Sequence, residues 1–252
     1  MNRPLYLRGL WRNDTLHFDP TGHLIDNSGV LTFTLSGFDL KSIRREHDKL
    51  VLEGRRMGLE FINGKQQRVS LGMGMLHNPA DEPIHIEIAA SPTGDYGPAL
   101  DAIFTDGLVD LVPSLPFYWK SYAQDNFVPD FHALPPLAVA TKTPDQIRQS
   151  SSPQEEKPNH MDDAIIPPKL LRSVEPKFND VARRLQYGGT ALVNLQVKSD
   201  GTVANLSVVR PLGLGLDENA LITVQQYVFT PAMRDGKPTQ VELSVEVNFS
   251  IY

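Results

Sequence analysis

The side chains best suited to chemistry in the first half of the chain are His85 and Glu87. They lie two residues apart in the run Ile-His-Ile-Glu-Ile at 84–88, so on a strand both point to the same face. An imidazole and a carboxylate on one face can serve as two ligands of a metal ion. A zinc site needs at least three protein ligands, however, and no second histidine lies nearby in the sequence. The pattern favours a solvated strand face, and we predict no metal site.

A second candidate is the loop Gly-Leu-Gly-Leu at 213–216, which precedes an amphipathic segment. Phosphate-binding loops also place glycines before a helix. This loop lacks both the later glycine or lysine and the parallel βαβ setting of such sites. The chain has no cysteine, which excludes thiolate nucleophiles and thiolate metal ligands. No nucleophile and base stand in a recognisable arrangement, so the sequence predicts a protein that is not an enzyme and uses no cofactor.

Composition points to a folded protein that does not bind nucleic acid. The 252 residues are 40% hydrophobic and 21% charged, with a formal net charge of -6, whereas nucleic-acid binders present a basic face. No run reaches the roughly 18 apolar residues of a membrane span, and the first residues lack the apolar core of a signal peptide. We therefore expect contact with a membrane only through an anchor outside the printed sequence.

Short β segments separated by turns dominate the first part of the chain. Turn sequences such as Asn63-Gly64 suit two-residue hairpins, because both central positions need a positive φ. This spacing predicts an all-β domain over residues 1–138, built as a small sandwich or barrel. The expected strands are 4–10, 15–18, 30–35, 49–52, 58–62 and 84–89. A short helix is expected at 98–104 and an irregular strap at 111–138, where Phe117-Tyr118-Trp119 either line a groove or, as we favour, pack in the core.

Residues 139–165 contain almost no large apolar side chains and are rich in proline, serine and charged residues. Such a segment buries too little surface to offset the entropy of ordering it, so it is predicted to be a flexible linker. On this interpretation the two flanking parts are tethered rather than fused.

Residues 166–252 show the clearest alternation. A strand is expected at 190–197, then a hairpin turn at Ser199-Asp200-Gly201 and a returning strand whose inward residues are Ala204, Leu206 and Val208. A helix follows, with Asp217 at its N-cap or in its first turn. The final strand alternates from Val241 to Ile251. The sequence thus predicts an α+β domain in which a helix packs on a three-stranded antiparallel sheet, whose two outer strands offer unpaired backbone groups.

This C-terminal part resembles the C-terminal domain of TonB-family energy transducers. The resemblance rests on the Asp-Gly hairpin at 200–201, Gly-Leu-Asp-Glu-Asn-Ala-Leu at 215–221, Phe-Thr-Pro-Ala at 229–232 and Gly-Lys-Pro at 236–238. It implies an adaptor in the cell envelope that pairs an edge strand with a short peptide segment of an outer-membrane transporter. The family's Gln-Pro-x-Tyr-Pro contact segment corresponds here to Glu175-Pro176-Lys177-Phe178-Asn179, in which the proline and the aromatic character are kept.

The predicted function is therefore that of a non-enzymatic adaptor of the periplasm or cell envelope that docks a protein partner, with a homodimer through the same edge as a further arrangement. The predicted partner-binding residues are Glu175, Pro176, Lys177, Phe178, Asn179, Arg183, Arg184, Val241, Leu243, Val245, Val247, Phe249 and Ile251. The alternative is a soluble periplasmic protein whose β domain binds a ligand and whose C-terminal module mediates assembly. Exposed helix charges are the simpler explanation for Arg183 and Arg184.

Overall fold

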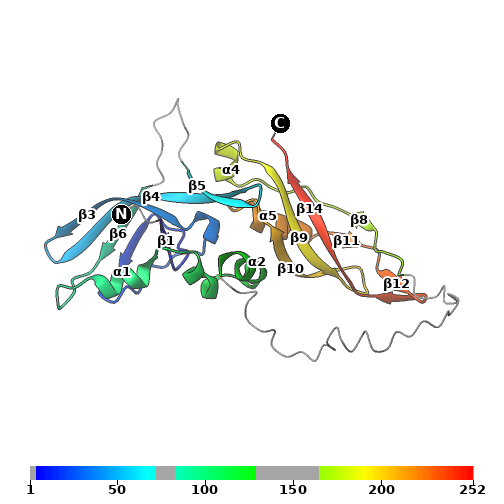
Figure 1. Cartoon of the computed structure of the whole chain (residues 1–252), viewed down its shortest axis with the longest axis horizontal. Helices are drawn as coiled ribbons and strands as arrows, with labels where there is room; N and C mark the ends of the chain where they lie inside the picture. Colours follow the sequence, from blue (N-terminus) through cyan, green and yellow to red (C-terminus); the bar gives the residue numbers. More distant parts are fainter. Residues whose placement is uncertain (1–3, 72–82, 129–164, 252) are drawn as a thin grey trace, which may run out of the picture.

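A computed structural model describes residues 4–71, 83–128 and 165–251 (Figure 1). The predicted linker at 139–165 lies outside these residues except for its last position. The first described part contains β1 (Leu5–Leu7), β2 (Thr15–Phe18), η1 (Phe33–Leu35), β3 (Gly37–Glu46), β4 (Lys49–Ile62), β5 (Lys65–Ser70), β6 (Pro83–Ile88), α1 (Gly97–Ile103), β7 (Phe104–Thr105), η2 (Val109–Ser114) and α2 (Phe117–Phe127).

The first part is rich in strands, as expected, but they form one seven-stranded sheet with the order β2-β6-β4-β3-β1-β7 and β5 paired to β4. The sandwich or barrel is therefore not what the described residues show. A second sheet is not needed to cover the apolar side chains of this sheet, because α1 packs on them. Its residues Ala99 and Ile103 belong to the same apolar cluster as Ile84 and Ile86 of β6. The pairing of β2 with β6 is parallel, whereas the other strand pairs of this sheet are antiparallel.

Several local expectations hold and others fail. The hairpin at Asn63-Gly64 is confirmed, with φ values of 51° and 73° and Ile62 opposite Lys65. The expected helix at 98–104 is α1. The expected strand at 30–35 is wrong, because its end forms the 3-10 turn η1, and the two strands at 49–52 and 58–62 are one strand, β4. The expected strap is wrong at 117–127, where the aromatic residues form α2.

The second described part contains β8 (Leu170–Arg172), α4 (Asp180–Arg184), β9 (Gly189–Val197), β10 (Val203–Arg210), α5 (Leu216–Val224), β11 (Val228–Phe229), β12 (Ala232–Arg234), β13 (Lys237–Thr239) and β14 (Val241–Phe249). Strands β10, β9 and β14 form the predicted three-stranded antiparallel sheet. Buried residues of α5 and β9, including Leu216, Ala220, Val193 and Leu195, belong to one apolar cluster, so the helix covers one face of the sheet.

The inward set expected for the returning strand needs one correction. Asn205 has a φ of 49°, and the register of β10 against β9 shifts between Ala204 and Ser207. This bulge changes which face each side chain occupies. Ala204 consequently lies opposite Gln196 on the polar face, whereas Val203 lies opposite the buried Val197.

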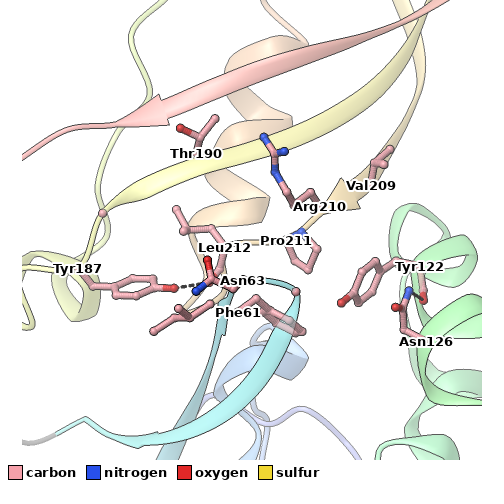
Figure 2. A pocket seen from close by; sticks show the side chains of 13 residues that line it. Phe61, Asn63, Tyr122, Asn126, Tyr187, Thr190, Val209, Arg210, Pro211 and Leu212 are labelled. Atoms are coloured by element: carbon pink, nitrogen blue, oxygen red, sulfur yellow. Dashed lines mark hydrogen bonds between the residues drawn. The ribbon is translucent and has the colours of Figure 1, made fainter.

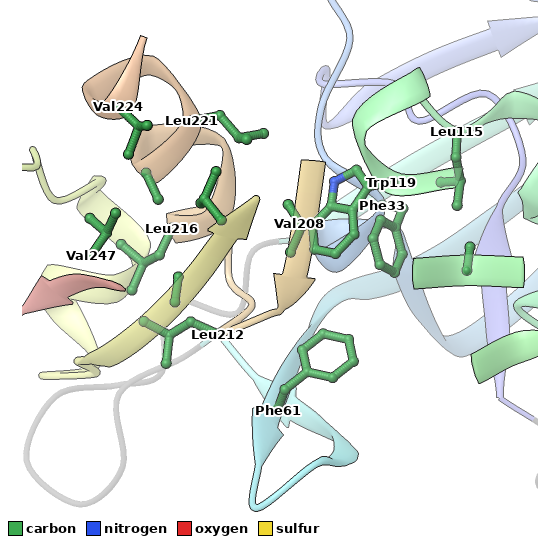
Figure 3. Close-up of a cluster of buried hydrophobic side chains, with 14 of the residues drawn as sticks. Phe33, Phe61, Leu115, Trp119, Val208, Leu212, Leu216, Leu221, Val224 and Val247 are labelled. Atoms are coloured by element: carbon green, nitrogen blue, oxygen red, sulfur yellow. The ribbon is translucent and has the colours of Figure 1, made fainter. Parts of the chain in front are cut away.

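The two described parts share one hydrophobic core. The same apolar cluster includes Phe33, Phe61 and Trp119 from the first part, and Val208 and Leu212 from the second (Figure 3). The parts are therefore in direct contact, and the expectation that they are joined only by a tether does not hold for the described residues.

Candidate functional site

Strand β14 forms the free edge of the C-terminal sheet. It pairs with β9 over its whole length, from Val241 opposite Val197 to Phe249 opposite Gly189. No other described strand pairs with its outer side. The opposite edge strand, β10, packs against α2 of the first part (Figure 1). A strand at the edge of a sheet leaves a row of backbone N–H and C=O groups unpaired, and β14 is such a strand among the described residues.

The predicted partner-binding residues of β14 lie on its inner face. Val247 and Phe249 are buried, whereas Val241, Leu243 and Val245 are only partly buried. Ile251, beyond the end of the strand, is exposed. On the polar face Glu246 accepts a hydrogen bond from Arg210 of β10 at 2.8 Å. Strand β14 thus presents partly exposed apolar side chains on one face of the sheet and polar side chains on the other.

The segment Glu175–Asn179 is held against the same module by its last three residues. The ring of Phe178 packs edge-on against that of Phe249, with 5.5 Å between centroids. The carbonyl oxygen of Lys177 accepts a hydrogen bond from Asn219 at 2.7 Å. Asn179 caps α4 by accepting from the amide of Ala182 at 2.8 Å and donates to the carbonyl of Leu214 at 2.6 Å.

The remaining predicted residues of this region reach the surface. Glu175 and Lys177 are exposed, and Pro176 is partly buried. Arg183 and Arg184 occupy the last turn of α4 with exposed side chains, and Arg183 lies 3.8 Å from Asp180. The structure therefore brings Phe178 together with β14, whereas the two arginines lie on a separate helix.

The loop before α5 joins the two sheets through backbone hydrogen bonds. The amide of Phe61 in β4 donates to the carbonyl of Leu212 at 3.1 Å, and the amide of Leu214 donates to the carbonyl of Leu59 at 3.0 Å. Gly213, with a φ of 97°, lies so close to β4 that a Cβ would overlap the carbonyl oxygen of Leu59. A glycine is therefore required at this position.

Two adjacent acidic residues stabilise this junction. Asp217 lies in the first turn of α5, but it does not occupy the N-cap position, which is Gly215. Its two carboxylate oxygens accept from the amides of Leu212 and Gly213, both at 2.7 Å. Glu218 Oε1 accepts from the indole N–H of Trp119 at 2.8 Å. Burial raises the pKa of both carboxyl groups.

Sequence patterns did not identify this junction. Trp119 was expected to be a core residue, and it is buried, but its partner Glu218 lies 99 positions away. Thr34 likewise accepts from the amide of Gly215 at 3.0 Å across the junction. The one available signal was the aromatic run at 117–119, because an indole in a core usually needs a hydrogen-bond acceptor.

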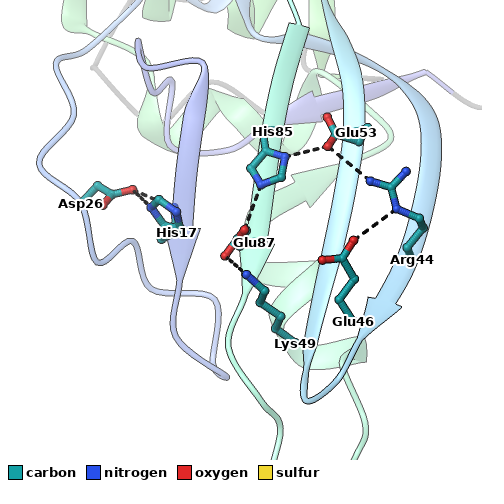
Figure 4. Close-up of polar contacts among 8 residues, drawn as sticks. All are labelled: His17, Asp26, Arg44, Glu46, Lys49, Glu53, His85 and Glu87. Carbon is teal, nitrogen blue, oxygen red and sulfur yellow. Dashed lines mark hydrogen bonds and ion pairs between the residues drawn. The ribbon is translucent and has the colours of Figure 1, made fainter.

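His85 and Glu87 belong to a chain of ion pairs on the first sheet (Figure 4). The two ring nitrogens of His85 lie 2.7 Å from Glu53 and 3.0 Å from Glu87, and Glu87 also pairs with Lys49. Hydrogen bonding to Glu87 and then Glu53 raises the pKa of His85 against its desolvation. A ring held by two carboxylates favours the protonated form, which does not ligate a metal. The groups of acidic and histidine side chains among the described residues include no metal-binding cluster.

A small sheet with one helix-covered face and a free edge strand defines this part of the chain as an α+β module. Residues 174–251 match the family model of the Gram-negative bacterial TonB protein C-terminal. The C-terminal part of this chain is thus a TonB-family C-terminal domain. That family is a periplasmic, non-enzymatic one that acts through contacts with other proteins, and the resemblance noted in the sequence is confirmed.

The solved structure of the TonB C-terminal domain of Pseudomonas aeruginosa is also similar to this chain. The two are 21% identical, and the match covers 37% of this chain and 90% of that chain with a TM-score of 0.28. No curated protein matches the chain. Among the described residues, none of the helices has the length and apolar character needed to cross a membrane.

Proposed function

We propose that the chain is a cell-envelope adaptor that binds a partner protein by pairing an extended segment of it with β14. The observation that carries the proposal is the unpaired outer side of β14 in the described structure, within a domain of the TonB family. Main-chain hydrogen bonds would supply affinity, and side chains alternating between the two faces of the sheet would supply selectivity. An outer-membrane transporter segment is the proposed partner.

The structure also supports a single docking edge for each chain. Helix α2 packs on β10, so the second edge of the sheet is covered by the chain itself. A partner strand at β14 would lie on the side of the sheet opposite the first part of the chain. The proposed adaptor therefore binds one extended segment at a time.

The experiment is a calorimetric titration of the full chain with extended peptides from outer-membrane transporters. Proline is introduced separately at Ser244 and Val245. Successive residues of a strand direct their N–H groups to opposite sides, so one proline removes an outward donor and the other breaks a bond to β9. We expect the outward proline to weaken binding at least tenfold with little change in stability, and the inward one to destabilise the fold.

If none of the transporter peptides binds, or if the outward proline leaves the affinity unchanged, docking at β14 is wrong. Light scattering of the free chain distinguishes the other arrangement, in which a second copy occupies the same edge.

A further inference from the structure

A cleft of about 690 Å³ lies where the β4–β5 hairpin, α2 and the end of β10 meet (Figure 2). Its size is within the range of about 300–1,000 Å³ that small-molecule sites occupy. The cleft is separate from the free edge of β14, because none of the residues that line it belongs to β14. It is built from both parts of the chain.

Three aromatic residues line this cleft. Tyr122 and Tyr187 are partly exposed, whereas Phe61 is buried, with 7% of its surface exposed. The rings of Phe61 and Tyr122 meet edge to face with centroids 5.8 Å apart. The hydroxyl of Tyr187 donates to the carbonyl of Leu212 at 2.7 Å. The hydroxyl of Tyr122 has no hydrogen-bond partner among the described residues, and Figure 2 shows it directed toward Phe61 and Pro211.

The Tyr122 hydroxyl is suited both to donate and to accept hydrogen bonds. Burial, followed by the charge of Asp217, raises the pKa of Tyr122 to about 12, so the phenol remains neutral under physiological conditions. A half-buried hydroxyl without a protein partner is free to bond a ligand or water. The wall of the cleft therefore presents an unused polar group between aromatic surfaces.

The other polar groups of the cleft are neutral or already neutralised. Asn126 donates to the carbonyl of Tyr122 at 2.8 Å, which leaves its own carbonyl oxygen as an acceptor. Asn63, at the tip of the hairpin, makes no side-chain hydrogen bond to another described residue. Arg210 is the charged residue of the lining, and its guanidinium is paired with Glu246 at 2.8 Å. The cleft thus has no uncompensated charge to select an ionic ligand.

We propose that this cleft binds a neutral saccharide. Sugar rings present apolar C–H faces that pack on aromatic rings, which here are the partly exposed rings of Tyr122 and Tyr187. Sugar hydroxyl groups both donate and accept hydrogen bonds, as the Tyr122 hydroxyl and the two asparagine amides require. An uncharged ligand is favoured because no charged group of the lining is left unpaired. The site is independent of docking at β14, and its test does not depend on that proposal.

The test is binding of glucose, N-acetylglucosamine and maltose to the full chain, measured by saturation-transfer NMR and by tryptophan fluorescence. Trp119 is a suitable reporter, because its ring centroid lies 6.0 Å from that of Tyr122. One hydrogen bond contributes about 0.5–1.5 kcal/mol, so Tyr122→Phe should weaken binding by roughly 2- to 13-fold. Asn63→Gly should weaken binding similarly, because it removes the side-chain amide. The turn itself should be kept, since glycine also accepts its positive φ.

The matched control is Tyr118→Phe, a second partly buried tyrosine of α2 that lines a different cavity. It should leave saccharide affinity within about twofold of the wild type, less than the loss of one hydrogen bond. The proposal is overturned if none of the three sugars binds, or if glucuronate or glucosamine binds in preference to them. It is also overturned if both Tyr122→Phe and Asn63→Gly retain full affinity while remaining folded.

Discussion

Asp217 is fully buried, with 0% of its surface exposed, and yet it carries an ionisable group. Both of its oxygens accept backbone amides of the loop before α5. Two N–H donors favour the carboxylate, whereas burial and the neighbouring Glu218 favour the protonated form and raise the pKa of Asp217. The side chain thus holds the loop that contacts β4, and its role is to shape the junction rather than to catalyse.

Asp217→Asn is expected to destabilise the protein by about 2 kcal/mol. The asparagine amide would place an N–H donor against one of the two backbone donors and leave that donor unpaired. Urea unfolding measures the change. Asp180→Asn is the control, because the Asp180 side chain is 90% exposed, and it should shift the unfolding free energy by less than about 0.5 kcal/mol. Equal effects of the two variants would show that the contacts of Asp217 do not matter.

The buried carboxyl group of Glu218 makes the stability of the fold depend on pH. Burial raises the pKa of Glu218 in the folded chain, and its Oε2 is buried without a hydrogen bond to another described residue. The folded state therefore holds a proton that the unfolded state, with a pKa of about 4.3, releases. The resulting stabilisation is complete below that unfolded value and is lost as the pH rises through the folded pKa.

Glu218→Gln cannot titrate, and its amide oxygen can still accept from Trp119. The variant should therefore gain stability relative to the wild type as the pH rises from about 4 to 8. Urea unfolding at several pH values gives the difference, and each unit of pKa change corresponds to about 1.4 kcal/mol. Glu242→Gln, on the exposed face of β14, should follow the wild type throughout. A pH-independent difference for Glu218→Gln would contradict the argument.

The strands and helices whose apolar residues recur with an unbroken period were predictable from the sequence. Strand β14 alternates without a miss, and β9 and α5 follow their own periods, so the sheet and its covering helix could be derived. The phase of β10 could not, because one bulge at Asn205 inverts it. Helix α2 was missed because its aromatic and proline-flanked sequence has no clear apolar stripe. The packing of α2 on β10 could not be derived from the period of either element, because it depends on contacts between segments that are far apart in the sequence.

The loop before α5 contacts β4 so closely at Gly213 that a larger residue does not fit there. Gly213→Ala should destabilise the protein by about 2 kcal/mol or more, because the φ of 97° is strained for alanine and the added Cβ would overlap Leu59. Gly107→Ala is the control, since a Cβ there has open space and no positive φ, and its effect should remain within about 0.5 kcal/mol. Thermal unfolding of the two variants provides the comparison. Near-identical transitions would indicate that the loop adjusts its position.

At the scale of the whole molecule, the C-terminal sheet has a different neighbour on each side. Its β10 side contacts the first part through α2 and shares a core with Phe33, Phe61 and Trp119. Its β14 side is open in the described structure. A partner bound at β14 would therefore be connected to the first part of the chain through β9 and β10, rather than only through the residues at 129–164.

This arrangement predicts that the two parts remain associated after the connecting segment is cut. A protease site introduced after Ser150, outside the described residues, allows the folded full chain to be cleaved, and size-exclusion chromatography then shows whether the fragments elute together. The backbone hydrogen bonds between β4 and Leu212–Leu214, together with the Trp119–Glu218 bond, should hold them in one peak. Trp119→Ala removes a fully buried ring and should separate the cut fragments. Trp11→Ala, a change of equal size at a ring that packs on Phe18 within the first part, should leave them together. If the cut wild type elutes as two separate fragments, the shared core does not bind the parts, and the first part acts as a tethered domain.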